Sequence, residues 1–228
     1  MKKNLLKIAA LLIAMLSAVN VSAQFSLPNL PITYGVEAGL TLSNFATDNK
    51  NADFSAILGY SIGVTAEYSI TEQIFLQSGL SLLTKGAKRS ESHRDSDGSY
   101  EFEMTARPML FQLPVHAAYK FQVKEGIIVN VNAGPYLALG IGGKIKHEDS
   151  FTDRSGDTET EKGDENFFGS EKKGGFKNID YGFGIGTGVE IGKISINLTI
   201  NWGAANLSRS SVSELKLNCT ALSVGHKF

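Results

Sequence analysis

A chain of 228 residues with a formal net charge of −1 lacks the basic surplus expected of a protein that binds nucleic acid. Its single cysteine, Cys219, excludes an internal disulfide and is interpreted as a small packing residue. Glycine is abundant, with 24 residues, whereas proline is scarce with 5. This balance is typical of β-structure with a tightly filled interior rather than of a disordered chain.

The first 23 residues have the three parts of a secretory leader. Lys2, Lys3 and Lys7 form a basic region, and the apolar run that follows is too short for a membrane anchor. A small-residue cleavage pattern ends at Ala23. We therefore expect residues 1–23 to be a signal peptide and a mature chain, 24–228, that begins at Gln24 and forms one domain.

The mature chain is predicted to be all-β, because apolar residues recur at every second position and no helical period is sustained. Eight strands are expected: Ile32–Asn44, Phe54–Tyr68, Gln73–Lys88, Tyr100–Phe121, Gly126–Lys146, Ile179–Ile191, Ile194–Ala204 and Val212–Phe228. In the last of these the alternation changes phase between Cys219 and Leu222, which predicts a bulge.

The face opposite the apolar one distinguishes a membrane barrel from a soluble sandwich. It carries mainly Gly, Ser, Thr and Asn, which suit a narrow polar interior, whereas a soluble sheet exposes many Lys and Glu. We therefore predict an eight-stranded antiparallel up-and-down transmembrane β-barrel that contacts lipid. Its strands must close into a cylinder because an open edge in hydrocarbon leaves backbone groups unpaired.

The connections between the predicted strands alternate between long and short. Outer-membrane barrels show this pattern because periplasmic turns are short and outer loops longer, so both termini are expected in the periplasm. Six aromatic residues fall near that rim and are expected to form an interfacial girdle: Tyr34, Tyr68, Phe75, Tyr119, Phe121 and Phe228.

Several stretches in this order resemble the PorT-like outer-membrane β-barrel family of Bacteroidetes-type bacteria. They are Gly35–Asn44, Leu113–Val115 with Tyr119–Lys120, Gly134–Leu137, Asp180–Glu190 and Leu222–Phe228. His226 stands where that family often has Tyr. The resemblance implies an eight-stranded barrel and a C-terminal strand read by the barrel-assembly machinery. One branch of the family serves a secretion system, and nothing in this sequence singles out that branch.

Seven polar residues are expected to face the interior: Glu37, Glu67, His116, Lys120, Lys144, Asp180 and Glu190. An eight-stranded barrel is just wide enough to be filled by its own side chains, and buried charges must pair. A structural ion-pair network is therefore favoured over a proton relay or a conduction path.

Two predicted outer loops are candidate ligand sites. Asp95-Ser96-Asp97-Gly98 resembles the start of a calcium loop but lacks the later ligands, so a solvated turn is favoured. The long acidic connection 147–178 could bind divalent cations or a surface ligand, and its composition favours a mobile hydrophilic loop. No catalytic, cofactor or metal residue is assigned.

We expect a non-enzymatic protein of the outer membrane, a lipid-embedded anchor whose outer loops provide recognition. The enzymatic alternative, a hydrolase or acyl-transfer enzyme, would gather residues of the outer loops: His93, Asp95, Ser96, His147 and Asp149. No motif fixes such a geometry. A third alternative is an assembly partner of a secretion machine.

Overall fold

The structure is a computed structural model that describes residues 31–48, 53–94, 98–153, 155, 157–169, 175–209 and 214–228. Its strands are β1 (Ile32–Thr47), β2 (Ser55–Ser69), β3 (Ile74–Thr84), β4 (Ala87–Arg94), β5 (Gly98–Lys124), β6 (Ile127–Asp153), β7 (Thr158–Asn166), β8 (Ile179–Ile191), β9 (Ile194–Gly203) and β10 (Leu215–Lys227). The expected leader and Gln24 lie outside the described residues. Within the described ranges, no helix has the length and apolar character needed to cross a bilayer.

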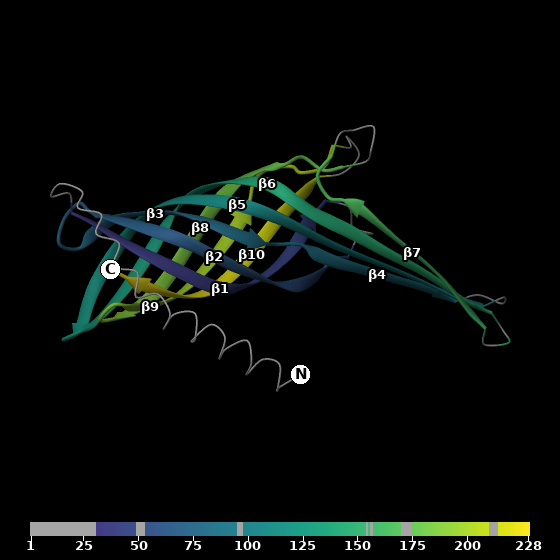
Figure 1. The fold of residues 1–228 in the computed structure, drawn as a ribbon, viewed down its shortest axis with the longest axis horizontal. Coiled ribbons are helices and arrows are strands. Elements are labelled where there is room, and N and C mark those ends of the chain that lie inside the picture. Colours follow the sequence, from purple (N-terminus) through teal and green to yellow (C-terminus); the bar gives the residue numbers. More distant parts are fainter. Residues whose placement is uncertain are drawn as a thin grey trace.

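Eight of these strands form a closed antiparallel ring, which confirms the predicted barrel (Figure 1). The ring runs β1, β2, β3, β5, β6, β8, β9 and β10, and β10 returns to pair with β1. Strand β4 continues β3 beyond Lys85 and Gly86, and β7 is a return strand paired with β6. Closure leaves no strand edge open around the cylinder.

The outside of the ring is a continuous apolar surface. On β5 the outward residues from Met109 to Phe121 are apolar or aromatic, and Phe111 and Leu113 are 40% and 45% exposed. At ~3.3 Å per residue and a tilt of ~45°, this stretch has a height of roughly 28 Å. That height matches the apolar band of an outer-membrane barrel, so this surface contacts lipid.

One end of the barrel carries the expected aromatic girdle. The exposed members are Tyr34, Tyr68, Tyr119, Phe121 and Phe228. The prediction for Phe75 was wrong, because odd-numbered residues of β3 face the interior and its ring lies 4.4 Å from Lys120 Nζ. At this end the Phe228 N–H donates to the Tyr34 carbonyl oxygen at 3.0 Å, so the first and last described strands meet here.

The bulge predicted in the last strand is absent, since β10 pairs in continuous register with both neighbours. Its odd-numbered residues face inward throughout. Leu215 and Leu217 are buried in an apolar cluster, whereas Cys219, Ser223 and Gly225 line the polar part of the interior. The change of phase in the sequence therefore reflects a change in the interior from apolar to polar, and the backbone register does not change.

A bulge that the sequence pattern does not reveal occurs in β6. Leu110 pairs with Gly140 and Met109 pairs with Gly142, so Ile141 is the extra residue. The bulge inverts the alternation of everything that follows in β6. Lys144 consequently points outward and is exposed, which corrects its assignment to the interior.

Beyond the bulge, β4, β5, β6 and β7 leave the barrel as a four-stranded antiparallel sheet that projects away from the ring (Figure 1). The expected loops over 89–99 and 147–178 are therefore wrong for the residues that form these four strands. Arg94 already pairs with Ser99, and His147 to Asp153 continue β6. We call this extension the projecting sheet.

Candidate functional site

The interior near the aromatic girdle holds a balanced ion-pair network. Lys120 contacts both Glu67 and Glu190, and Lys227 Nζ lies 3.3 Å from Glu67 Oε2 and 2.8 Å from Glu190 Oε1. Gln77 donates a further bond to Glu67 at 2.8 Å. Each carboxylate thus meets two ammonium groups, the arrangement that offsets the cost of burying these charges.

A polar cavity of about 160 Å³ adjoins this network. Glu37 faces it and accepts hydrogen bonds from Ser81 and Ser223, both at 3.3 Å. His116 Nδ1 lies 2.9 Å from Asn132 Oδ1, while His116 Nε2 has no protein partner. A space of this size and polarity suits a few ordered water molecules that would satisfy such groups.

Farther from the girdle, a second ion pair crosses the barrel. Lys85 Nζ lies 3.3 Å from Asp180 Oδ2, and neither side chain is exposed to solvent. The Tyr136 hydroxyl donates to the same carboxylate oxygen at 3.2 Å, and the ammonium lies 4.7 Å from the centre of the Tyr136 ring. This cluster marks the boundary between the polar and apolar parts of the interior.

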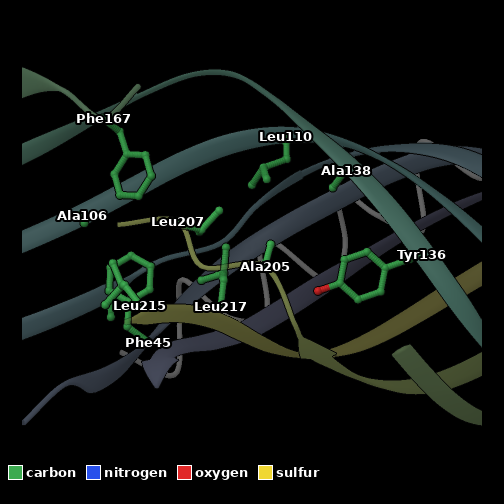
Figure 2. Packing of buried hydrophobic residues seen from close by; sticks show 11 residues of the cluster. Phe45, Ala106, Leu110, Tyr136, Ala138, Phe167, Ala205, Leu207, Leu215 and Leu217 are labelled. Atoms are coloured by element: carbon green, nitrogen blue, oxygen red, sulfur yellow. The ribbon is translucent and has the colours of Figure 1, made fainter. Parts of the chain in front are cut away.

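An apolar plug fills the interior at the end that bears the projecting sheet (Figure 2). Phe167 is fully buried, and its ring stacks on Phe176 at 4.7 Å and on Phe45 at 6.0 Å between centroids. Leu207 and Leu217, which are 1% and 0% exposed, pack in the same cluster. The described residues on either side of 170–174 therefore pack into the barrel mouth through Phe167 and Phe176, which corrects the expected hydrophilic loop for these residues.

The structure gathers most of the predicted interior residues but adds two that sequence reasoning missed. Glu37, Glu67, His116, Lys120, Asp180 and Glu190 all face the interior. Lys85 and Lys227 were missed, although continuing the odd-numbered inward positions of their strands would have found both. The ion pairs and the plug together close the interior, as expected for a filled barrel.

One face of the projecting sheet continues the interior face of the barrel and is the best candidate for recognition. We call it the inner face. On β5 it carries Tyr100, Phe102 and Met104, because the even-numbered residues of β5 face the interior side from Tyr100 to Lys120. On β6 it carries Asp149 and Phe151, the partners of Phe102 and Tyr100.

The centre of the inner face is aromatic and its surroundings are acidic. Tyr100 and Phe151 are 44% and 43% exposed. The Tyr100 hydroxyl donates to Asp149 at 2.8 Å, and this hydrogen bond raises the pKa of the Tyr100 phenol. The edge strands place Glu91 and Glu161 in the row of Phe102 and Asp149. Exposed rings beside carboxylates form a surface that favours a cationic partner.

The foot of the inner face is hollowed where it meets the plug. A cavity of about 170 Å³ lies there, lined by Phe45, Thr47, Phe54, Arg89, Met104, Ala106, Ile145, Phe176, Ser208 and Leu215. Arg89 pairs with Glu91 through its Nη2. The cavity therefore combines apolar walls with one cationic side chain at its edge.

The two histidines of the candidate catalytic set, both within the described residues, are not brought together. His93 lies on β4 in the row of Tyr100 and Phe151, whereas His147 lies four residues from Phe151 on β6. Two strand spacings of ~4.8 Å and four rises of ~3.3 Å place the two histidines roughly 16 Å apart. Asp95 and Ser96 lie outside the described residues, as does the calcium-like stretch apart from Gly98. Among the residues that are described, no group of three His, Cys, Asp or Glu could hold a metal ion.

The ring, its apolar outer band and its filled interior agree with the family comparison. Residues 22–209 match the family described as "Outer membrane protein beta-barrel domain". The chain belongs to this family. It is therefore an outer-membrane β-barrel, in which the apolar band contacts lipid and the projecting sheet stands outside the bilayer.

Solved structures of small outer-membrane barrels resemble the chain at low identity. Ail, the attachment invasion locus protein of Yersinia pestis, was solved in complex with the heparin analogue sucrose octasulfate and is 10% identical, with a TM-score of 0.38. That match covers 87% of this chain and 100% of Ail. Neisserial surface protein A is 14% identical, with a TM-score of 0.40, and the match covers 86% of this chain and 97% of that protein. No curated protein matches the chain. At these values the likeness carries no argument about function.

Proposed function

We propose that this protein is a non-enzymatic outer-membrane anchor that presents the inner face of its projecting sheet to a binding partner at the cell surface. One observation carries the proposal. The barrel interior is closed by the plug and by the Lys85–Asp180 pair, whereas strands β4 to β7 continue beyond the apolar band as an ordered sheet with exposed rings.

Residue geometry supports recognition over catalysis. His93 and His147 stand on different strands at a separation that excludes direct proton exchange, and Asp149 is engaged by Tyr100. A hydrolase or acyl-transfer enzyme would require these groups within hydrogen-bond reach of one another. Recognition requires only that the rings and carboxylates of the inner face be rigidly held, which the four-stranded pairing provides.

The orientation of the barrel in the membrane and its relationship to the PorT-like family are part of the same proposal. The leader 1–23 would be removed on export, and both ends of the mature chain would lie in the periplasm, with the projecting sheet at the cell surface. The proposal also includes membership of the PorT-like family and recognition of the C-terminal strand, which ends at Phe228, by the barrel-assembly machinery. N-terminal sequencing of the purified protein tests the cleavage, and protease treatment of whole cells tests the orientation.

Site-specific photo-crosslinking on intact cells tests recognition. A photoreactive amino acid replaces Tyr100 or Phe151, which stand on the inner face. The matched controls replace Ser99 or Thr152, the next residues on the same strands, whose side chains point to the opposite face. We expect the same adduct from both inner-face positions and none from the controls. Absence of adducts at all four positions would overturn the proposal, as would equal labelling of both faces.

A further inference from the structure

A group of cationic side chains lies on the outward face of the projecting sheet, where its strands leave the barrel. The group consists of Lys88 on β4, Arg107 on β5, and Lys144 and Lys146 on β6, and we call it the basic rim patch. Arg107 pairs with Lys144 across the strands, while Lys88 and Lys146 both pair with Thr105. The four residues therefore occupy two successive outward rows of the same face.

The basic rim patch begins directly where the lipid-facing surface ends. Met109 is the last apolar outward residue of β5, and Arg107 is the next outward position. On β6 the last large apolar outward residue is Ile141, which is 47% exposed, and after the bulge the outward positions are Gly142 and then Lys144. Side chains at this level lie among lipid headgroups, the depth at which cationic groups meet phosphates.

The patch holds more positive charge than its own carboxylates neutralise. Lys88 Nζ lies 2.6 Å from Glu103 Oε1, and Lys144 is paired with Asp164. Arg107 reaches only the Leu58 carbonyl oxygen, at 3.5 Å. Lys146 has no ion-pair partner among the residues that the structure describes. Arg107 is thus left without a carboxylate partner, and Lys146 shares with Lys144 the single carboxylate of Asp164, its cross-strand neighbour.

Arg107 and Lys146 are placed to share one ligand. They are diagonal neighbours across the β5–β6 pair, with Cα atoms separated by ~7–8 Å, and both side chains are long enough to converge on a single anion. A guanidinium and an ammonium together match a phosphate, because both donate charge-assisted hydrogen bonds to its oxygens.

We propose that the basic rim patch binds the phosphate of an anionic lipid in the adjoining leaflet, with Arg107 and Lys146 as its direct ligands. The lipid's acyl chains would lie against the apolar band below, beside Met109 and Ile141. A soluble anion gains nothing from that band, which is why the position selects a lipid. This inference concerns the depth at which the barrel is held and is independent of the partner proposed for the inner face.

The test uses the full folded chain in nanodiscs of phosphatidylcholine with a minor fraction of phosphatidylglycerol. Native mass spectrometry counts the phosphatidylglycerol that the released protein retains. At about 1 kcal/mol per cationic side chain, we expect Arg107→Gln and Lys146→Gln each to lower the affinity about fivefold, and the double variant about 30-fold. The matched control is Lys162→Gln, which removes a cation paired with Glu148 farther along the same face and should leave retention unchanged.

Three outcomes would overturn the inference. They are unchanged retention in the double variant, an equal loss in Lys162→Gln, and displacement of the lipid by inorganic phosphate at a concentration matching the lipid. Because Arg107 and Lys146 are exposed, the variants should fold. Heat-modifiable migration on gels verifies their folding. A loss of lipid retention with intact crosslinking at Tyr100 separates this site from the inner face.

Discussion

Lys85 and Asp180 face each other across the barrel, with 3.3 Å between Nζ and Oδ2 and no solvent exposure of either side chain. Lys85 comes from the junction between β3 and β4, and Asp180 from the second position of β8. The pair therefore joins opposite walls of the cylinder at the level where the polar interior meets the plug. Removing one partner would leave a buried charge without compensation.

We expect Lys85→Met and Asp180→Asn each to lower the free energy of unfolding by about 3–5 kcal/mol, the usual cost of breaking a buried pair. The double variant, Lys85→Met with Asp180→Leu, should recover much of that loss because no charge remains. Urea unfolding in lipid vesicles, followed by the fluorescence of the single tryptophan Trp202, measures each value.

The exposed pair of Lys162 and Glu148 supplies the control for this prediction. Its two side chains are 68% and 44% exposed, so Lys162→Ala should change the free energy of unfolding by at most about 1 kcal/mol. If Lys85→Met cost no more than this control, the pair would not be a buried structural link.

A second prediction concerns Phe167, at the centre of the plug. Its ring is fully buried and stacks on Phe45 and Phe176, so Phe167→Ala leaves a cavity in the barrel mouth. We expect a loss of about 3–5 kcal/mol in the free energy of unfolding. We also expect brief ion-conducting openings in planar bilayers, where the unaltered protein should conduct no steady current.

Phe151→Ala is the matched control, because it removes the same ring from an exposed position of the projecting sheet. It should leave the conductance unchanged and the free energy of unfolding within about 0.5 kcal/mol. A large, stable channel in the unaltered protein would contradict the closed interior on which the proposed function depends.

Sequence alternation predicted the eight ring strands because inside and outside differ chemically within the bilayer. The strand Ile179–Ile191 was predicted with the bounds that the structure gives it. The same signal fails outside the bilayer, where both faces of a strand meet water. Strand β7, with the sequence TETEKGDEN, has no apolar residue and could not be recognised as a strand by this criterion.

The errors in the interior have two physical causes. Lys144 was misplaced because the single extra residue at Ile141 inverts the alternation, and an exposed Lys gives no sign of that shift. The plug was missed because Phe167 and Phe176 lie in an acidic segment and meet Phe45 only through tertiary folding. No sequence motif assigns a catalytic role to His93 or His147, and the expectation that they have none stays a prediction.

A third prediction tests how closely the interior is packed around Gly184. A Cβ added there would lie 2.5 Å from Asn201 Oδ1 and 3.1 Å from His116 Nε2. We expect Gly184→Ala to lower the free energy of unfolding by about 1–3 kcal/mol, since these side chains must move in a filled interior. Gly142→Ala, where a Cβ would meet nothing within 4 Å, should be close to neutral in the same unfolding assay. Equal effects at both positions would show that the backbone conformation, not packing, sets the cost.

The Lys144–Asp164 pair ties β7 to β6 on the outer face of the projecting sheet and makes the last prediction. The hydrogen bond from Lys144 lowers the pKa of the Asp164 carboxyl below its ordinary value. A lowered pKa means that the pair stabilises the folded sheet fully above the ordinary aspartate pKa, and that this contribution disappears as the pH falls through the lowered value. Because both side chains are exposed, the effect on stability is small, and the titration itself is the better measurement.

We expect Lys144→Ala to raise the pKa of Asp164 toward its ordinary value. An NMR titration of the side-chain carboxyl carbon in nanodiscs measures this shift directly. Lys216→Ala is the control, because Lys216 on β10 pairs with Glu214, which precedes that strand, and its loss should leave the Asp164 titration unchanged. The register places Lys144 beside Asn166 and Lys146 beside Asp164, so the ion pair runs diagonally between rows. An unchanged titration in Lys144→Ala would therefore mean that Lys146, the direct cross-strand neighbour, is the cation that holds this carboxylate. The assignment of Lys146 as a lipid ligand would then fail.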